Sequence, residues 1–337
     1  MTLPGPGAFH YFLRDLPRNA WDRIYPQGSF AVVNGADREG LGMGAAPGLT
    51  LTAGNLRLTI SPSIGGSISA FEWAEEAGGC PILRECNNGA GNVLDSASFP
   101  LVPYVNRIRD GRFTFRGREV RLASNMAGDP SPLHGQGWLA SWQVEDADAR
   151  SAVLSFAHHA GEWPWCYETR QAFALDEGGL SIRLTCRNID DKPMPCGLGQ
   201  HPYFSCGPAT RLATSVTHAW TIDEHVLPVE KVPADGPFDL RDRLACGQGL
   251  DHGFGGWGGS VRMSDPAWPF DLEMSSPDAH FFQLYSPAEG GLFVAEPVTH
   301  ANAALNAPEV RWPELGMRVL EPQEEMRLDM RIAVLPK

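Results

Sequence analysis

Five polar segments of this chain carry side chains that could transfer protons. The clearest is GLGQHPYF, in which His201 stands beside a proline and two aromatic rings in a glycine-rich setting. The others are PYVNRIRDGRF (103–113), SPLHGQGW (131–138), GLDHGFGGWGG (249–259) and VAEPVTHANAALN (294–306). Each interrupts an alternating apolar pattern, so we expect strand ends and loops, where functional residues concentrate on a rigid scaffold.

Each candidate residue, taken alone, also has a purely structural explanation. Arg107 would be explained by a surface pair with Asp110, and His134 by a glycine turn. His201 would be explained by a buried ring whose nitrogens are both hydrogen-bonded, and Glu296 by a solvated carboxylate at a strand end. The residue types therefore favour a function only if several of them meet at one place.

The segments between these motifs predict an all-β protein. Apolar and polar residues alternate over 56–60, 180–186, 270–274 and 328–334, which is the period of a half-buried strand. The 337 residues include 37 Gly and 28 Pro, which suit tight turns and disfavour helix interiors. We expect a large antiparallel β-sandwich or barrel with few short helices, one of them near residues 11–24.

The chain shows no repeat and no low-complexity linker. Residues 1 to about 48 are irregular, so we expect them to form a leader that packs on the body. Residues 49–337 are then a single β domain. The sequence leaves open whether the protein is a monomer or a homodimer.

Charge and cysteine content narrow the classes of partner and compartment. A net charge of −13 argues against nucleic acid, and no apolar run is long enough to span a bilayer. The N-terminus does not read as a secretory signal. Seven cysteines without a C-x-x-C pair suggest reduced thiols in a cytoplasmic protein, with neither a disulfide frame nor a zinc site.

From about Leu49 onward the chain resembles the aldose 1-epimerase (galactose mutarotase) family. The resemblance rests on five segments in the family's order: Asn106-Arg107-Ile108, Leu133-His134-Gly135, His201-Pro202-Tyr203-Phe204, Leu250 to Phe254, and Glu296. It implies a β-sandwich of the galactose mutarotase type, with a free aldose bound in a cleft across one sheet. It implies no cofactor and no metal.

The resemblance also implies roles for individual side chains. Glu296 would be the base and His201, as imidazolium, the acid, on opposite sides of the sugar. The other members of the implied site hold the sugar: Arg107, His134 and Asp251, with Asn106 and Tyr203 as further candidates. Four aromatic or imidazole side chains are either additional sugar contacts or structural residues: Trp138, Phe204, His252 and Trp257.

Departures from the family pattern leave the substrate open. After Glu296 the chain reads PVTHANA, where relatives commonly have Thr or Ser and then Pro-Asp. A non-catalytic sugar-binding protein, or a modified sugar such as a phosphorylated one, remains an alternative. So do a glycoside hydrolase using Asp251 with Glu296 and a metal hydrolase using His134, His201 and Asp251.

Overall fold

A computed structural model of the chain describes residues 48–337 except 75–78 and 87–90. The predicted helix at 11–24, and the predicted leader apart from Gly48, lie outside the described residues. Within them the protein is all-β, and each helix is a single 3₁₀ turn. These turns are η1 (Val93–Asp95), η2 (Arg109–Gly111), η3 (Gly137–Leu139), η4 (Gly236–Phe238), η5 (Ala304–Asn306), η6 (Glu309–Arg311) and η7 (Pro313–Leu315).

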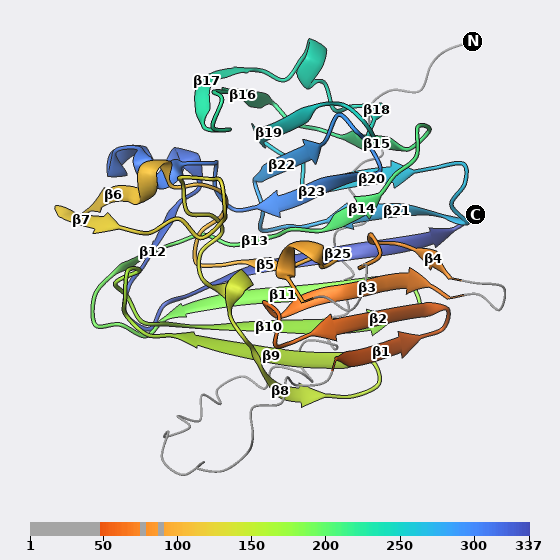
Figure 1. Ribbon diagram of the computed structural model, residues 1–337, viewed down its shortest axis with the longest axis horizontal. Helices are drawn as coiled ribbons and strands as arrows, with labels where there is room; N and C mark the ends of the chain where they lie inside the picture. The colour runs from red at the N-terminus through yellow and green to blue at the C-terminus, as the bar shows by residue number, and fades with distance from the viewer. Residues whose placement is uncertain (1–47, 75–78, 87–90) are drawn as a thin grey trace, which may run out of the picture. The chain divides into compact units, whose positions relative to one another are not determined.

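The largest sheet has nine strands and supplies one layer of the sandwich (Figure 1). Its long central strands pair antiparallel, with Ile182 opposite both Phe173 and Met330. In spatial order the strands are β18 (Arg243–Leu244), β15 (Arg211–Thr214), β20 (Ser260–Ser264), β21 (Phe270–Ser275), β25 (Glu325–Pro336), β11 (Gly179–Asn188), β10 (Tyr167–Asp176), β9 (Ser151–His158) and β8 (Gln143–Ala147).

The second large sheet has eight strands and carries the candidate site. In spatial order its strands are β17 (Pro228–Pro233), β16 (His218–Ile222), β19 (Leu250–Gly255), β22 (Phe281–Ser286), β23 (Leu292–Val298), β13 (Gly199–Gln200) and β5 (Pro100–Leu101). The eighth strand, β14 (Tyr203–Ser205), also pairs with β23.

Three smaller sheets complete the described part of the chain. One has the order β1 (Leu49–Ala53), β2 (Leu56–Ser61), β3 (Ser67–Trp73) and β4 (Cys80–Pro81). The other two are the pairs β6 (Arg112–Phe115) with β7 (Arg118–Arg121) and β12 (Met194–Cys196) with β24 (Arg318–Leu320).

One apolar core joins the two large sheets. Phe254, Phe282 and Leu284 of the eight-stranded sheet lie in the same buried cluster as Ile182 and Leu328 of the nine-stranded sheet. Because side chains alternate along a strand, the residues between these core positions point to the opposite face. The opposite face of β22 therefore carries Phe281, Gln283 and Tyr285.

The predicted strands are confirmed, but two of the predicted loops are wrong in part. Asp251 lies inside β19 and Glu296 inside β23. Glycines obscure the alternation in GLDHGFGG. In β23 six of the seven residues are buried, so a half-buried pattern is not visible there. The two carboxyl groups are therefore fixed by a sheet and not by flexible connections.

The prediction of reduced thiols is wrong for one pair of cysteines. Cys206, which follows β14, forms a disulfide with Cys246, and their Cα atoms are 5.7 Å apart. The two residues are 40 positions apart in sequence, so their pairing could not be read from a short motif. The thiol argument for a cytoplasmic location is weakened accordingly.

The structure also bears on membrane insertion. Over residues 48–337, apart from the two undescribed gaps, no helix has the length and apolar character needed to cross a bilayer.

Candidate active site

The face of the eight-stranded sheet that points away from the shared core carries two of the predicted carboxyl groups, Asp251 on β19 and Glu296 on β23, with β22 between them. Gln283 of β22 lies opposite Gly253 of β19 on one side and Glu296 of β23 on the other. The Gln283 amide nitrogen donates to Asp251 Oδ1 over 2.7 Å. Glu296 is only 3% exposed and Gln283 only 4%. The sheet therefore holds Asp251, Gln283 and Glu296 in a fixed arrangement on one face.

His201 meets Glu296 at this face. Its Nε2 lies 3.5 Å from Glu296 Oε1. The imidazole ring packs against two aromatic rings, with centroids 4.5 Å from Phe99 and 4.6 Å from Tyr203. The backbone N–H of His201 donates to the Phe99 carbonyl. These two aromatic contacts hold the ring beside the carboxyl group.

This proximity corrects one expectation. A carboxyl oxygen and an imidazole nitrogen separated by 3.5 Å leave no space for a sugar ring between them, so the pair does not lie on opposite sides of a substrate. The two groups lie side by side. At 3.5 Å the contact is also longer than a normal N–H···O hydrogen bond.

Both groups retain hydrogen-bonding capacity. His201 Nδ1 and Glu296 Oε2 are buried and have no hydrogen-bond partner among the described residues. Buried polar atoms are nearly always paired, because an unpaired one loses its bonds to water without compensation. Such atoms are therefore candidates for contacts with a ligand.

His134 is held in one tautomer by the main chain. Its Nδ1 accepts a hydrogen bond from the Asn106 backbone N–H at 3.1 Å, so in the neutral ring the proton is on Nε2. The His134 backbone N–H in turn donates to the Asn106 carbonyl. The ring lies edge-on to His201, with centroids 5.5 Å apart. His134 therefore offers an N–H donor next to the His201–Glu296 pair.

Arg107 supplies the positive charge of the site. Its Nε forms an ion pair with Asp129 at 2.9 Å, and its Nη1 donates to the Asn106 side-chain oxygen at 3.2 Å. The pairing with Asp110 considered from the sequence does not occur. The Arg107 charge lowers the pKa of Glu296 and Asp251, against the larger effect of burial. Five of the predicted positions thus share one electrostatic environment with Asn106 at its edge.

Burial determines the charge state of the central pair. Removal from water raises the pKa of Glu296 well above its usual value, and the nearby Asp251 raises it further. The same effect lowers the pKa of His201 to about 3. Burial therefore favours the protonated, neutral form of Glu296 and the neutral form of His201. Burial thus disfavours the imidazolium that the sequence analysis expected at His201.

Tyr203 lies between His201 and a cation that the sequence analysis did not single out. The Arg84 guanidinium carbon lies 3.5 Å from the Tyr203 ring centroid. Arg84 Nε donates to the Ser96 carbonyl, which holds the guanidinium in place. Burial raises the pKa of Tyr203 to about 12, so the phenol stays protonated. Tyr203 thus supports the His201 ring directly.

Three further residues of the site were missed from the sequence: Gln283, Phe99 and Asp129. Gln283 had a recognisable signal, because it is the one polar residue within the apolar run FFQLY. A buried polar side chain requires hydrogen-bond partners, and the Gln283 amide donates to Asp251. Phe99 and Asp129 had no local signal.

The residues with an undecided role lie away from the pair or beneath it. Phe204 stacks on Phe293, and Trp257 stacks on Phe282, both within the core. His252 accepts from the Asp251 backbone N–H and packs on Phe238. Trp138 is 1% exposed and packs against the His134 ring. All four are structural in this fold.

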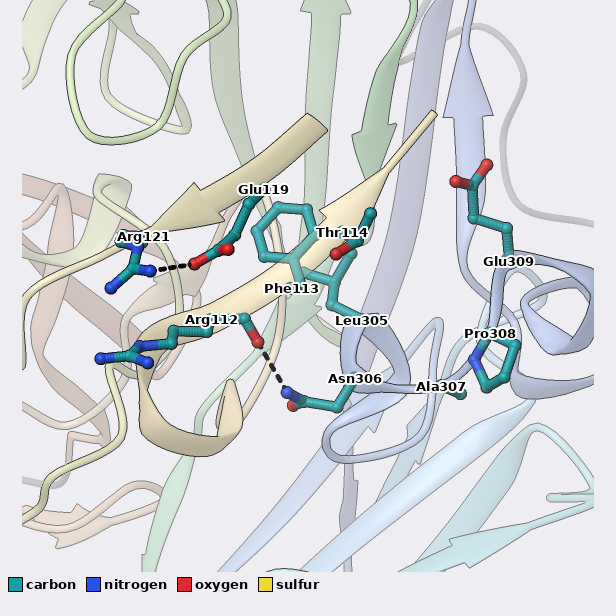
Figure 2. A pocket seen from close by; sticks show the side chains of 10 residues that line it. All are labelled: Arg112, Phe113, Thr114, Glu119, Arg121, Leu305, Asn306, Ala307, Pro308 and Glu309. Atoms are coloured by element: carbon teal, nitrogen blue, oxygen red, sulfur yellow. Dashed lines mark hydrogen bonds and ion pairs between the residues drawn. The ribbon is translucent and has the colours of Figure 1, made fainter. Parts of the chain in front are cut away.

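A separate hollow lies between the β6–β7 hairpin and the segment after η5 (Figure 2). Its polar groups pair with one another: Arg121 with Glu119 at 2.6 Å, and the Asn306 amide with the Arg112 carbonyl at 2.8 Å. It contains none of the predicted site residues. Its lining residues are Arg112, Phe113, Thr114, Glu119, Arg121, Leu305, Asn306, Ala307, Pro308 and Glu309.

A metal centre finds no support in the described part of the chain. No group of three His, Cys, Asp or Glu side chains there is arranged to hold a metal ion. His134 Nδ1 is already occupied by a backbone N–H, which leaves that nitrogen unable to act as a ligand.

The chain is similar to known proteins both in sequence and in structure. The family model described as aldose 1-epimerase matches residues 47–333. The uncharacterized protein YphB of Escherichia coli strain K12 is 33% identical over 271 residues, which are 77% of this chain and 90% of YphB. An E. coli K12 crystal structure superposes with a TM-score of 0.79 at 30% identity, covering 86% of this chain and 99% of the other.

A more distant structure shares the fold. A galactose mutarotase-like protein from Clostridium acetobutylicum superposes with a TM-score of 0.75 at 18% identity. The match covers 86% of this chain and 95% of that one.

Proposed function

Since the chain belongs to the aldose 1-epimerase family, we propose that it interconverts the α and β anomers of a free aldose. The observation that carries the proposal is the contact of 3.5 Å between His201 Nε2 and Glu296 Oε1. Opening a pyranose requires a proton to leave the C1 hydroxyl and another to reach the ring oxygen. Both oxygens are bonded to C1, so adjacent acid and base groups suit the reaction.

The proposed cycle begins with the transfer of a proton between these two side chains. Transfer from Glu296 to His201 creates a carboxylate and an imidazolium. The carboxylate then takes the C1 hydroxyl proton while His201 protonates the ring oxygen and the C1–O5 bond breaks. Rotation about C1–C2 turns the aldehyde, and the reverse transfers close the ring on the other face. When the pyranose ring has closed and His201 has returned its proton to Glu296, both side chains carry the same number of protons as at the start.

The surrounding residues bind the sugar in this proposal. His134 donates its Nε2–H to a sugar oxygen, because its Nδ1 is already an acceptor. Asp251 keeps one carboxyl oxygen on Gln283 and accepts a sugar hydroxyl with the other. Arg107 donates from its guanidinium, and Asn106 orients it through the contact at Nη1. Tyr203 borders the sugar beside His201.

Charge at the site favours a neutral sugar. Arg107 is already paired with Asp129, and Arg84 with backbone carbonyls and the Tyr203 ring. Two carboxyl groups, Asp251 and Glu296, face the same region. A phosphate there would meet little unpaired positive charge. Hydrolysis of a glycoside is less well supported, because Glu296 contacts an imidazole where a second carboxylate would be required.

Polarimetry on freshly dissolved α-anomers of glucose, galactose, xylose and arabinose tests the proposal. We expect the purified protein to accelerate the approach to equilibrium rotation for at least one sugar. A protein that binds one of these sugars, as measured by calorimetry, but leaves its rate unchanged would be a binding protein. Release of a chromophore from aryl glycosides would indicate hydrolysis instead.

A further inference from the structure

The main chain at His134 adopts a conformation that residues with a side chain rarely take. His134 has a φ of 60° and Gly135 a φ of 74°, so both lie in the left-handed region. A Cβ atom at Gly135 would lie 2.0 Å from the Val102 carbonyl oxygen, so a larger residue would not fit there without a shift. Backbone of this kind persists only where the surrounding contacts hold it. Those contacts therefore decide where the His134 ring lies.

Asn125 supplies contacts to the residues before and after His134. Its Oδ1 accepts from the Leu133 backbone N–H over 2.8 Å, and its Nδ2 donates to the Leu133 carbonyl over 2.7 Å. The same Nδ2 donates more weakly to the Gly135 carbonyl, at 3.4 Å. All three hydrogen bonds go to main-chain atoms. The Asn125 side chain thus acts on His134 through the peptide groups that flank it.

These contacts complement those that Asn106 makes with the same residue. The Asn106 backbone binds the ring at Nδ1 and the backbone N–H of His134. It makes neither of the contacts to Leu133 and Gly135. The direction of the free Nε2–H therefore depends on two supports, of which Asn125 holds the turn itself.

The loop that follows β7 and carries this asparagine is itself held in place. The Ala123 backbone N–H donates to Glu162 Oε2 over 2.9 Å. Farther along the loop, Asp129 forms the ion pair of 2.9 Å with Arg107. One loop therefore contacts two of the proposed sugar-binding residues, Arg107 through its side chain and His134 through the neighbouring backbone. A loop held at several points is suited to fix the positions of other groups.

We propose that Asn125 is a positioning residue, which directs the His134 Nε2–H toward the sugar by fixing the main chain on either side of His134. The inference rests on the proposed anomer interconversion and on the proposed role of His134 in binding the sugar. Without the Asn125 amide, the flanking peptide groups can leave the left-handed turn, and the ring moves with them. A donor that shifts by about 1 Å loses much of its hydrogen bond, because these bonds weaken steeply with distance and angle.

The first test removes the three hydrogen bonds in Asn125→Ala. Polarimetry on whichever of glucose, galactose, xylose and arabinose reacts fastest gives kcat and KM. We expect kcat/KM to fall about tenfold, mostly through KM, because His134 contacts the bound sugar before and during ring opening. Asn125→Asp keeps the acceptor for the Leu133 N–H but cannot donate, and it replaces Asn125→Ala in every measurement if that variant does not fold.

A double-substitution cycle shows whether Asn125 acts through the His134 ring. His134→Asn removes the imidazole, and asparagine tolerates a positive φ. If the ring carries the effect, adding Asn125→Ala to His134→Asn lowers kcat/KM by less than about twofold further. A further loss of about tenfold in that background would mean that the two residues act independently, which overturns the inference.

Asn188 offers a matched control whose hydrogen bonds reach none of the site residues. Its Nδ2 donates to the Lys192 and Leu320 carbonyls, and its Oδ1 accepts from the Asp190 backbone N–H. We expect Asn188→Ala to lower the melting temperature at least as much as Asn125→Ala, because Asn188 is fully buried, and to leave KM within about twofold. An equal rise of KM in both variants would show that KM follows stability and would overturn the inference. The double-substitution cycle decides the question alone if Asn188→Ala does not fold.

The outcomes separate this inference from the proposed function. If the unmodified protein interconverts an aldose and Asn125→Ala does so with unchanged kcat and KM, the inference about Asn125 alone is wrong. If no aldose is interconverted, the proposed function is wrong, and sugar binding measured by calorimetry tests the same variants through Kd with the same expected ratios. A protein that neither interconverts nor binds any of the four sugars overturns both.

Discussion

The surroundings of His201 and His300 differ in how the ring nitrogens are used, although both rings are largely shielded from water. His300 Nε2 accepts from the Val105 backbone N–H at 3.0 Å, and its Nδ1 lies 2.8 Å from the Ala301 carbonyl. His201 Nδ1 has no partner among the described residues, and its Nε2 has only the long contact with Glu296.

The difference shows that shielding alone does not mark a functional histidine. Burial lowers both pKa values, to about 4 for His300 and about 3 for His201. The main chain uses both nitrogens of His300, which therefore holds two segments together. The nitrogens of His201 remain available for a ligand. Substitutions should consequently affect stability at one position and catalysis at the other.

The largest expected effect is at Glu296. Glu296→Gln preserves the shape of the side chain but removes its ability to accept a proton, so we expect the rate of anomer interconversion to fall by about 10³–10⁴-fold. The melting temperature should change little. Polarimetry and calorimetry measure the two quantities. A rate within tenfold of the unmodified protein would falsify the assignment of the base.

The next effect contrasts the two histidines directly. His201→Asn is expected to lower kcat by about 10²–10³-fold, because water can replace an acid only in part. His300→Leu leaves the buried Val105 N–H unpaired, so we expect a loss of about 1–3 kcal/mol in the free energy of unfolding. Urea denaturation and polarimetry are measured on both variants. Equal effects of the two substitutions on kcat would contradict the comparison.

A smaller effect is expected at Asp251. In Asp251→Asn the side chain keeps an oxygen for Gln283 but loses its charge, so a sugar hydroxyl is bound more weakly. We expect KM to rise about tenfold with a smaller change in kcat, as for a hydrogen bond to a charged group. Steady-state polarimetry separates the two constants. A loss confined to kcat would instead indicate a direct part in proton transfer.

A further expected effect concerns acid stability. The unfolded chain protonates His300 near pH 6.5, whereas the folded chain does so only near pH 4. Between these values the unfolded state binds about one more proton, so this residue contributes a loss of about 1.4 kcal/mol per pH unit as the pH falls. Above pH 6.5 the contribution is constant. Urea denaturation from pH 7 to 4.5 should show a shallower decline in His300→Leu.

Catalysis should follow a different pH dependence. Because the pKa of His201 is lowered to about 3, the imidazole ring does not acquire its second proton in the unliganded protein near pH 6.5. We expect kcat/KM to show no inflection at that value. A clear inflection near pH 6.5 in the unmodified protein, absent from His201→Asn, would mean that His201 is more exposed to water during turnover than in this structure.

The sequence allowed the strands to be predicted and the candidate site residues to be named, because both are local signals. Alternation identified β2, β11, β21 and β25, and short motifs identified His201 and His134. The hydrogen bonds between side chains of the site, by contrast, join residues that are far apart in the sequence. The pairing of Arg107 with Asp129 and the bond from Gln283 to Asp251 join residues 22 and 32 positions apart.

The charge states of the site residues could not be predicted from the sequence either. Whether His201 carries a proton depends on how completely Phe99 and Tyr203 exclude water, and that follows from packing between distant segments. The disulfide between Cys206 and Cys246 is set by the same long-range geometry. A motif gives the identity of a group, and the fold determines its acidity.

In the proposed cycle, the side-by-side placement of Glu296 and His201 determines where the transferred protons come from and where they go. During opening and closure these two groups take up the proton that the sugar loses and supply the proton that it gains. A full turnover then takes no proton from the solvent and releases none to it. Catalysis of this kind would run at the same speed in dilute and concentrated buffer, whereas the spontaneous reaction depends on whatever acids and bases the solution provides.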